Sequence, residues 1–355
     1  MLARWRTVIL DSSRKLSVGV IGLGLMGIQH AAILNSLDSV NLVCLCESEP
    51  FLARVASNLM SKVRLYRDYM EMTDAEDLDA VFITTPTPSH TTVARRIFEA
   101  NDDISVFIEK PLGASYKDAA NFADYVSREK RRVCIGFQKR YVGTYRKAKQ
   151  ILETGELGQV LSFKAHHYTS DVTREGNGWR FEKGIGGVTR DFAPHLLDLL
   201  IWFFGMPVSC QSLVQRIHSR EVEDFVHSDL VFEGDVIGSI EACWSFGHSK
   251  SPDITIEIRT RGGFIAVSDD RITTWYNPGW TEGGPNIQAG YSTAYSSMLT
   301  ASVPYLISYP EYTIQDQSFL ESVKYNRPPP YGVEDAVKVN QLVDMILSDG
   351  VSAKT

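Results

Sequence analysis

The sequence predicts an α/β protein: a parallel sheet covered by helices on both faces, followed by an α/β domain with a large, mostly antiparallel open sheet. Three observations lead to this prediction. The chain has 355 residues, which is more than one hydrophobic core usually holds. Short, continuous apolar runs alternate with helical segments up to residue 139, as in a covered parallel sheet. Beyond residue 140 the strands are longer and are separated by turn residues.

The first half contains a regular alternation of predicted strands and helices. Each predicted strand is a run rich in Val, Ile, Leu and Phe, and each following segment has the length of a helix. This order is typical of strands joined by helical crossovers. The predicted strands cover 16–24, 40–47, 78–86, 104–111 and 131–137, with helices at 28–37 and 50–60 and between the later strands.

The second half begins with a predicted helix over 145–158, and its strands are joined by the turn sequences EGD and RGG. An antiparallel sheet can leave one face uncovered, so we expect a homodimer or homotetramer to form through it. Residues 276–304 lack a clear period and predict a long loop. The expected organisation is an N-terminal extension at 1–15, a first domain at 16–139, a second domain at 140–332, and a C-terminal helix and tail at 333–355.

Composition narrows the class of partner. The net charge is −7, with 44% hydrophobic and 22% charged residues, so nothing indicates binding to nucleic acid or to an anionic membrane. The five cysteines are scattered, which favours buried thiols over a metal site. The first 13 residues lack the apolar core of a signal peptide, and no apolar run has the length of a membrane span. We therefore expect a cytoplasmic protein.

A glycine loop indicates a dinucleotide site. In VGVIGLGLMGIQHA, Gly22, Gly24 and Gly27 form G-x-G-x-x-G between a predicted strand and a predicted helix. Such glycines allow a tight turn and close approach of the backbone to a pyrophosphate, which the helix N-terminus then binds. Glu47 ends the next strand, where a carboxylate binds ribose hydroxyls and repels a 2′-phosphate. Since Ser48 and Glu49 add no positive charge, the sequence predicts NAD rather than NADP.

Two later loops also follow predicted strands. Ligands of such sheets lie at the carboxyl ends of the strands, so TTPTPSH (84–90) and EKP (109–111) are candidates to line the cofactor site. A lysine at the second position could hold a substrate hydroxyl or share in proton transfer. The alternatives are a proline-stiffened turn for the first loop and a Glu–Lys pair that leaves the sheet for the second.

The segment GGVTRDFAPHLLDLLIWFFG (186–205) combines an apolar helix with Asp191, His195 and Asp198, spaced i, i+4, i+7. Pro194 suits a first helical turn, so the helix is predicted to begin at about Ala193. Asp191 then lies just before the helix and His195 in its first turn. Asp198 lies deeper, and we expect it to pair with the backbone or an arginine. A metal held by Asp191 and His195 is the alternative interpretation.

The chain resembles the glucose–fructose oxidoreductase/inositol dehydrogenase (Gfo/Idh/MocA) family over residues 16–345. The resemblance rests on GVIGLGLMG, VFITTPTPSH, VFIEKP, VCIGFQKRY and GGVTRDFAPHLLDLL, which occur in the family's order and spacing. The EKP element combined with the later Gly-Gly and Asp-x-x-x-His is the specific part. The resemblance implies a Rossmann dinucleotide-binding domain, an α/β domain whose open sheet forms oligomers, and nicotinamide-dependent oxidation or reduction of sugars, cyclic polyols or related alcohols.

The resemblance also implies roles. The family's EKP lysine falls on Lys110, and its Asp-x-x-x-His falls on Asp191 and His195. We expect His195 to be the base, Asp191 to orient it and stabilise its imidazolium, and Lys110 to stabilise the alkoxide-like transition state. Trp179 and Arg180 match a Trp-Arg that lies near the pocket in sugar-oxidising members.

One departure limits transfer of a relative's substrate. Arg190 and Phe192 flank Asp191, where many relatives have small residues.

The strand that ends at Tyr168 also points toward the predicted pocket. Because side chains alternate along a strand, His166 and His167 face opposite ways, so one of them is expected to be structural.

The prediction is an NAD-dependent oxidoreductase that transfers a hydride between the nicotinamide and a secondary alcohol of a sugar, sugar derivative or inositol-like polyol, with no metal. The alternatives are an NADP-linked reductase, an NAD-dependent glycosidase and a non-catalytic dinucleotide-binding regulator. The predicted catalytic residues are Lys110, Asp191 and His195. The predicted cofactor-binding residues are Gly22, Gly24, Leu25, Met26, Gly27, Glu47, Thr85, Pro86, Thr87, His90, Glu109 and Lys110. The predicted substrate-binding residues are Lys110, Arg140, Tyr168, Trp179, Arg180, Asp191 and His195.

Overall fold

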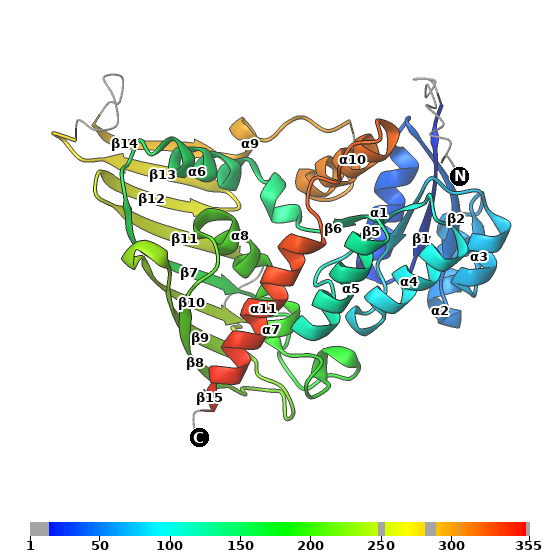
Figure 1. Ribbon diagram of the computed structural model, residues 1–355, viewed down its shortest axis with the longest axis horizontal. Helices are drawn as coiled ribbons and strands as arrows, with labels where there is room; N and C mark the ends of the chain where they lie inside the picture. Colours follow the sequence, from blue (N-terminus) through cyan, green and yellow to red (C-terminus); the bar gives the residue numbers. More distant parts are fainter. Residues whose placement is uncertain (1–13, 248–252, 281–288, 305, 353–355) are drawn as a thin grey trace.

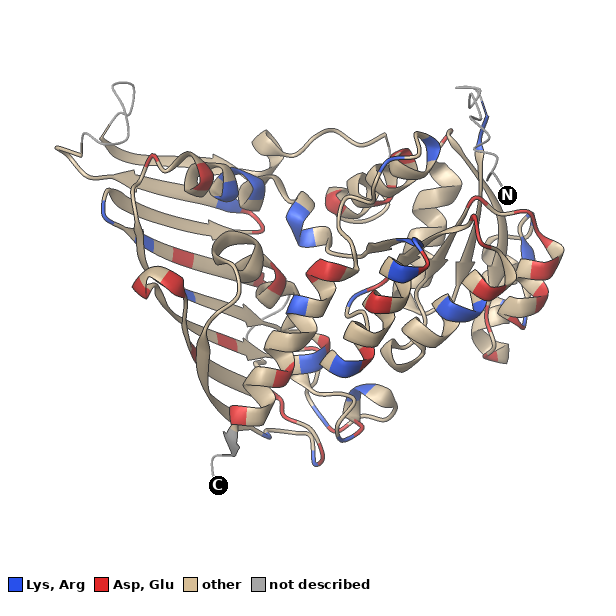
Figure 2. Cartoon of the chain, in the orientation of Figure 1, with Lys and Arg blue, Asp and Glu red and all other residues tan. Residues whose placement is uncertain are grey.

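The computed structural model describes residues 14–247, 253–280, 289–304 and 306–352. Two sheets lie at opposite ends of the molecule, and helices α8, α10 and α11 occupy the space between them (Figure 1). Most of the predicted N-terminal extension and part of the predicted 276–304 loop fall outside the described residues. Acidic and basic residues are interspersed along both halves (Figure 2).

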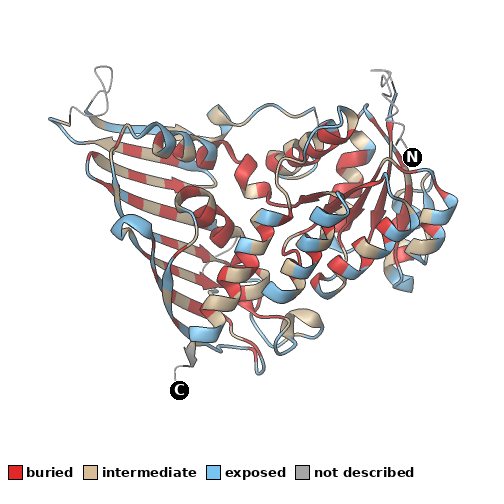
Figure 3. Cartoon of the chain, in the orientation of Figure 1, coloured by how far each residue is buried: buried red, intermediate tan, exposed pale blue. Residues whose placement is uncertain are grey.

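The first sheet is the predicted parallel one, and its strands run in the order β3-β2-β1-β4-β5-β6. Every predicted strand is present, and the short β3 was not predicted because three residues are too few to show a period. Helices on both faces bury the apolar strands, as Figure 3 shows. The strands are β1 (Leu16–Ile21), β2 (Val40–Cys46), β3 (Arg64–Tyr66), β4 (Ala80–Ile83), β5 (Ser105–Ile108) and β6 (Arg132–Ile135), and the helices are α1 (Leu25–Ser36), α2 (Pro50–Leu59), α3 (Tyr69–Ala75), α4 (His90–Ala100) and α5 (Tyr116–Arg128).

The second sheet has the order β14-β13-β12-β11-β7-β10-β9-β8-β15. It is largely antiparallel, as predicted, with parallel pairs at β7–β10 and β8–β15. EGD joins β9 to β10 and RGG joins β11 to β12, both antiparallel pairs. The strands are β7 (Val160–Tyr168), β8 (Ser209–Gln215), β9 (Phe225–Val231), β10 (Ile237–Cys243), β11 (Asp253–Thr260), β12 (Gly263–Ser268), β13 (Arg271–Tyr276), β14 (Gly290–Tyr295) and β15 (Val351–Ser352).

The helices of this half are α6 (Gly143–Thr154), α7 (Val188–Asp191), α8 (Pro194–Phe204), α9 (Ser296–Leu299), α10 (Pro310–Lys324) and α11 (Val333–Asp349). Short 3-10 turns lie at η1 (Thr87–Ser89), η2 (Gln138–Tyr141), η3 (Trp179–Phe181) and η4 (Glu233–Asp235). The long loop predicted over 276–304 is partly wrong, because β14 and α9 lie within it. The Ser, Thr and Tyr residues of β14 pair along β13 at the sheet edge instead of following an apolar period.

Helix α10 lies against the first sheet, although the sequence assigned its residues to the second domain. Phe319, Leu320 and Val323 pack in the same core as Phe82 and Phe107 of β4 and β5. Figure 1 shows α10 beside α1. The chain therefore returns from the second domain to complete the core of the first. Among the described residues, no helix has both the length and the apolar character needed to cross a membrane.

Candidate active site

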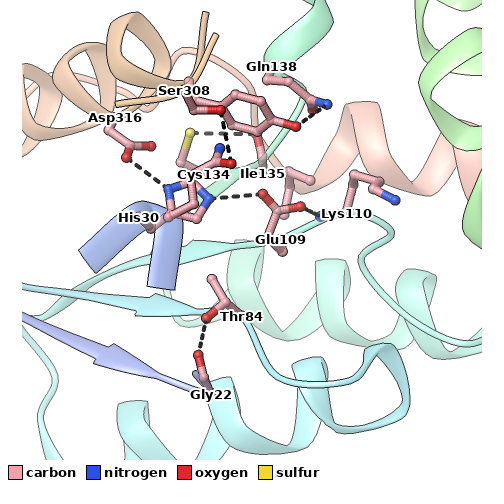
Figure 4. A network of polar contacts seen from close by, with 12 residues as sticks. Gly22, His30, Thr84, Glu109, Lys110, Cys134, Ile135, Gln138, Ser308 and Asp316 are labelled. Carbon is pink, nitrogen blue, oxygen red and sulfur yellow. Dashed lines mark hydrogen bonds and ion pairs between the residues drawn. The ribbon is translucent and has the colours of Figure 1, made fainter. Parts of the chain in front are cut away.

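The glycine loop forms a cradle between β1 and α1. Gly22 has a φ of +88°, and a Cβ there would lie 2.8 Å from the backbone of Thr85. A Cβ on Gly27 would lie 1.8 Å from the Gly22 carbonyl oxygen, so only glycine lets the helix start this close to the strand. Beside Gly24 a Cβ would meet open space. The Thr84 hydroxyl donates to the Gly22 carbonyl over 2.6 Å and fixes the turn (Figure 4).

Glu47 lies at the carboxyl end of β2, as predicted. Its Oε2 accepts the backbone N–H of Leu23 at 2.6 Å, and its Oε1 accepts that of Glu49 at 2.8 Å. Each carboxylate oxygen keeps a lone pair for a further donor. Glu47 therefore holds the glycine loop and still faces the adjoining cavity.

A cavity of about 830 Å³ extends from this loop along the carboxyl ends of β1, β2, β4 and β5. The glycine cradle, the acid and the free helix N-terminus together fit a dinucleotide. Gly27 supports the cradle from behind, and the other predicted cofactor-binding residues lie in the cavity wall: Gly22, Gly24, Leu25, Met26, Glu47, Thr85, Pro86, Thr87, His90, Glu109 and Lys110. We call this the first cavity.

His90 ties two loops of the first cavity together. Its Nδ1 lies 2.9 Å from the carbonyl oxygen of Pro111, and its Nε2 lies 2.7 Å from that of Thr85. The side chain is buried, and burial lowers its pKa. A neutral ring has a single N–H and donates to one of these two carbonyls, and His90 lies between the TTPTPSH and EKP loops.

Glu109 belongs to a buried charge network below the cavity (Figure 4). His30 of α1 lies between two carboxylates, with Nδ1 2.8 Å from Asp316 Oδ2 and Nε2 3.1 Å from Glu109 Oε1. Burial opposes the charged ring, but Asp316 and then Glu109 outweigh it and raise the pKa of His30 to about 10. Glu109 Oε2 also accepts the backbone N–H of Lys110 at 3.0 Å. The network thus links α1 and α10 to the segment that carries Lys110.

A second cavity, of about 1000 Å³, meets the first at three side chains. Lys110, Arg180 and Asp191 line both cavities, whereas His195 lines the second. Lys110 Nζ donates to the Asp191 carbonyl oxygen at 2.8 Å and lies 3.8 Å from Asp191 Oδ1. Arg180 Nε lies 2.6 Å from Asp191 Oδ2. The two cations thus hold Asp191 at the junction, and Trp179 lines the first cavity beside them.

His195 lies in the first turn of α8, and α8 begins at Pro194, within one residue of the predicted start. Its Nδ1 lies 3.2 Å from the amide nitrogen of Gln138. Burial, followed by the positive charge of Lys110 and by His167 and Lys139, lowers the pKa of His195 well below its ordinary value. Asp191 was expected to orient this ring, but its carboxylate pairs with Arg180 and Lys110.

Arg140 was predicted to bind substrate, and this is wrong. It is 3% exposed, with Nη2 2.6 Å from Asp198 Oδ1 and Nη1 3.2 Å from Asp335 Oδ1. Arg140 lines neither the first cavity nor the second, as the described residues form them. The expected structural pairing of Asp198 with an arginine is confirmed. Burial nonetheless raises the pKa of Asp198 to about 6, against the pull of Arg140.

Tyr168, which was predicted to contact the substrate, lines neither the first nor the second cavity. Its hydroxyl donates to the carboxylate of Glu241, and its ring stacks on His166. This is the outer face of the second sheet, away from α8. Strand alternation puts His167 on the inner face, where it is 1% exposed and lines the second cavity. The residue next to the predicted one therefore reaches the site.

Comparison with known families agrees with this geometry. Residues 16–137 match the model described as "Oxidoreductase family, NAD-binding Rossmann fold". Residues 145–266 match the model of the GFO/IDH/MocA C-terminal domain. The chain belongs to the Gfo/Idh/MocA family. This confirms the resemblance and the NAD-binding Rossmann domain inferred from the glycine loop.

Several named members of the Gfo/Idh/MocA family are similar to this chain. Inositol 2-dehydrogenase of Salmonella typhimurium is 31% identical over 163 residues, which cover 45% of this chain and 48% of that enzyme, about half its length. Levoglucosan dehydrogenase of Pseudarthrobacter phenanthrenivorans is 26% identical over 296 residues, covering 73% and 75%. A solved structure of levoglucosan dehydrogenase in complex with NADH superposes with a TM-score of 0.81 at 22% identity, covering 95% and 97% of the two chains. This superposition shows that the two proteins share a fold.

Some site residues of this family member could not be predicted from its sequence. Gln138 and Tyr312 lie in the second cavity, and Lys139 Nζ lies 2.6 Å from Asp269 Oδ1 in the same wall. Arg67 lines the first cavity and donates to the Ser48 carbonyl oxygen. Gln138 and Lys139 directly follow GF at the end of β6, and this position after a strand of the parallel sheet could have indicated them as site residues. The described residues contain no group of three or more acidic, histidine or cysteine side chains arranged to hold a metal.

Proposed function

We propose that the protein is an NAD-dependent dehydrogenase that acts on a secondary alcohol of a sugar, a sugar derivative or a cyclic polyol. The observation that carries this proposal is the meeting of the two cavities at Lys110, Asp191 and Arg180, with His195 in the second wall. A dinucleotide in one cavity and an alcohol in the other would meet at these side chains. The relatives named inositol 2-dehydrogenase and levoglucosan dehydrogenase support the substrate class.

The protein's own groups provide binding and proton transfer. When bound, the nicotinamide supplies the hydride chemistry at the alcohol carbon. The glycine cradle binds the pyrophosphate, and Glu47 accepts hydrogen bonds from the ribose hydroxyls. His195 is neutral because its pKa is lowered, so one ring nitrogen can accept the proton of the alcohol.

Lys110 stabilises the negative charge that develops on the alcohol oxygen. Its ammonium donates one hydrogen to the Asp191 carbonyl oxygen at 2.8 Å and keeps two hydrogens for the substrate. Because the Lys110 side chain is only 13% exposed, its charge acts in a poorly solvated site, where it is worth more than in water. Asp191 is held by Arg180 at 2.6 Å and can accept a second substrate hydroxyl.

The test is turnover of NAD and NADP by the purified protein with a panel of sugars, inositols and sugar acids, followed by nicotinamide absorbance. We expect NADH formation with at least one sugar or polyol. His195→Ala should retain NAD affinity and lose turnover. Three outcomes would overturn the proposal: turnover with NADP alone, glycoside cleavage without net consumption of NAD, or dinucleotide binding without turnover of any compound.

We also propose that the outer face of the second sheet forms a homo-oligomer interface. Its exposed apolar side chains support this: Leu213, Val231, Ile237, Tyr291 and Tyr295 are 39–77% exposed and lie on the face opposite α8. Val231 and Ile237 are cross-strand partners on β9 and β10, and the two tyrosines lie on the edge strand β14; grouped exposed apolar side chains mark interaction sites. Sedimentation of the wild type and of Ile237→Lys tests the proposal. If the wild type is a multimer and Ile237→Lys has the same mass, the proposal is contradicted.

A further inference from the structure

Glu311 is a buried carboxylate in the wall of the second cavity. It lies in the first turn of α10, where the helix N-terminus favours a negative charge, and it is 7% exposed. Among the described residues, no group of another residue forms a hydrogen bond or an ion pair with its carboxylate. Burial raises the pKa of Glu311, and the charge of Lys139 opposes that rise. Because a buried carboxylate without a partner is costly, a ligand that donates hydrogen bonds to it would offset this cost.

Two other carboxylates of this wall already have partners. Asp191 Oδ2 lies 2.6 Å from Arg180 Nε. Asp269, between β12 and β13, has its Oδ1 2.6 Å from Lys139 Nζ. Unlike these two, Glu311 remains available to a ligand.

The charges of the second cavity disfavour an anion. As the described residues form it, the cavity is lined by seven carboxylates and four cationic side chains. Lys110, Arg180 and Lys139 each contact a carboxylate, and the fourth cation, Arg271, is exposed. Burial lowers the pKa of both histidines in the wall, so they add no positive charge. A ligand with a carboxylate or phosphate group would therefore meet an excess of like charge.

Glu311 and His195 belong to one continuous part of this wall. The hydroxyl of Tyr312, the next residue to Glu311, lies 3.2 Å from the amide nitrogen of Gln138, which lies 3.2 Å from His195 Nδ1. The charge of Lys139 acts on both Glu311 and His195. A ring that places its reacting carbon beside His195 can thus place another substituent at Glu311.

We propose that Glu311 is a specificity-determining residue: its carboxylate accepts hydrogen bonds from hydroxyl or amine substituents of the substrate ring and selects against substrates that carry a carboxylate or a phosphate. This inference rests on the proposed function, because it takes the second cavity to be the alcohol site. The two oxygens of a carboxylate can accept from two neighbouring donors, as adjacent hydroxyls of a ring provide. The substrate class is thereby narrowed to uncharged sugars, polyols and amino sugars.

The test measures binding of D-glucose, D-glucosamine, D-glucuronate and myo-inositol to the NADH-loaded protein by calorimetry. We expect at least one of the three compounds without a carboxylate to bind at least about tenfold more tightly than D-glucuronate. Comparison of D-glucosamine with D-glucose identifies the preferred donor as an amine or a hydroxyl. Because NADH cannot take a hydride from an alcohol, this measurement does not depend on turnover.

Glu311→Gln nearly preserves the shape of the side chain and removes its charge. It should weaken binding of the preferred compound by roughly tenfold, the value of one hydrogen bond to a charged group, and reduce the preference over D-glucuronate by at least as much. With NAD and an oxidised substrate, KM should rise while kcat changes by less than about threefold, because Glu311 acts away from the reacting carbon. Glu321→Gln, at an exposed position of the same helix, is the matched control.

Three results would overturn the inference: tighter binding of D-glucuronate than of the other compounds, an unchanged preference in Glu311→Gln, or binding of none of the four compounds. The expected preference, lost in Glu311→Gln but without turnover of any alcohol by the wild type, would support the inference and contradict the proposed function.

Discussion

The two cavities that meet at Lys110 are built in different ways. The first is built around a glycine loop at the carboxyl ends of parallel strands. The second is formed by side chains from separate elements: Gln138 after β6, His167 on β7, His195 on α8 and Tyr312 on α10. A backbone cradle needs particular residue types at fixed spacing, whereas a chamber of side chains depends on how distant elements pack. Substitutions in the two cavities should therefore have separable effects.

The largest effect is expected at the junction. Lys110→Met should lower kcat/KM by roughly 10²–10³-fold, because it removes the charge beside the developing alkoxide. NAD affinity, measured by fluorescence titration, should change little, since the cradle is intact. Lys117→Met, at an exposed lysine on α5, is the matched control. If Lys110→Met lost NAD affinity to the same extent as turnover, the separation between the cavities would be wrong.

A substitution in the buried charge network beneath the first cavity should lower the stability of the protein. His30→Phe fits the neighbouring rings of Phe82 and Phe107 but leaves Asp316 and Glu109 buried without their cation, at a cost of about 3–5 kcal/mol. Urea unfolding of His30→Phe and of the exposed control His218→Phe measures this difference. A loss equal to that of the control would show that the network contributes nothing to stability.

The same pair of variants predicts a pH dependence. The pKa of His30 is raised from 6.5 to about 10, so its stabilisation is fully present below about pH 6.5 and is lost as the pH rises through about 10. Wild-type stability should therefore fall between these values by more than that of His30→Phe. Parallel curves for the two proteins would mean that the ring is neutral in the folded state.

A smaller, selective effect is expected at the far end of the first cavity. Glu47→Ser removes the carboxylate that repels a 2′-phosphate and leaves Arg67 in the same wall. The ratio of kcat/KM for NADP over NAD should rise by about 10–100-fold, the value of one charged hydrogen bond. The double variant Glu47→Ser/Arg67→Ala should lose this gain. An unchanged ratio in the single variant would remove Glu47 from cofactor selection.

The smallest effect is expected on the outer face of the second sheet. Tyr168→Phe removes a hydrogen bond to Glu241, and Tyr168 lines neither cavity, so kcat/KM should change by less than about twofold. A tenfold loss of kcat/KM would show that Tyr168 belongs to the active site.

This contrast also explains how far the sequence could be interpreted. The parallel sheet, the glycine loop, Glu47 and the start of α8 follow from local patterns, and the structure has them where they were predicted. Arg140 was predicted to bind substrate, but its guanidinium pairs with Asp198 and is buried. The prediction of Tyr168 was off by one residue, because strand alternation does not by itself tell which face of the sheet is inner. Gln138 and Tyr312 are brought together by the return of α10, which no local pattern predicts.

The return of α10 to the first sheet has a consequence for biosynthesis. Phe319 and Leu320 belong to the core that also contains Phe82 and Phe107, yet a ribosome makes them long after β6. At ordinary elongation rates the delay between residue 137 and residue 320 is roughly 10–40 s. During that time the nascent first domain exposes the apolar surface that α10 later covers. The core of the first domain is thus complete only after the second domain and α10 have been synthesised.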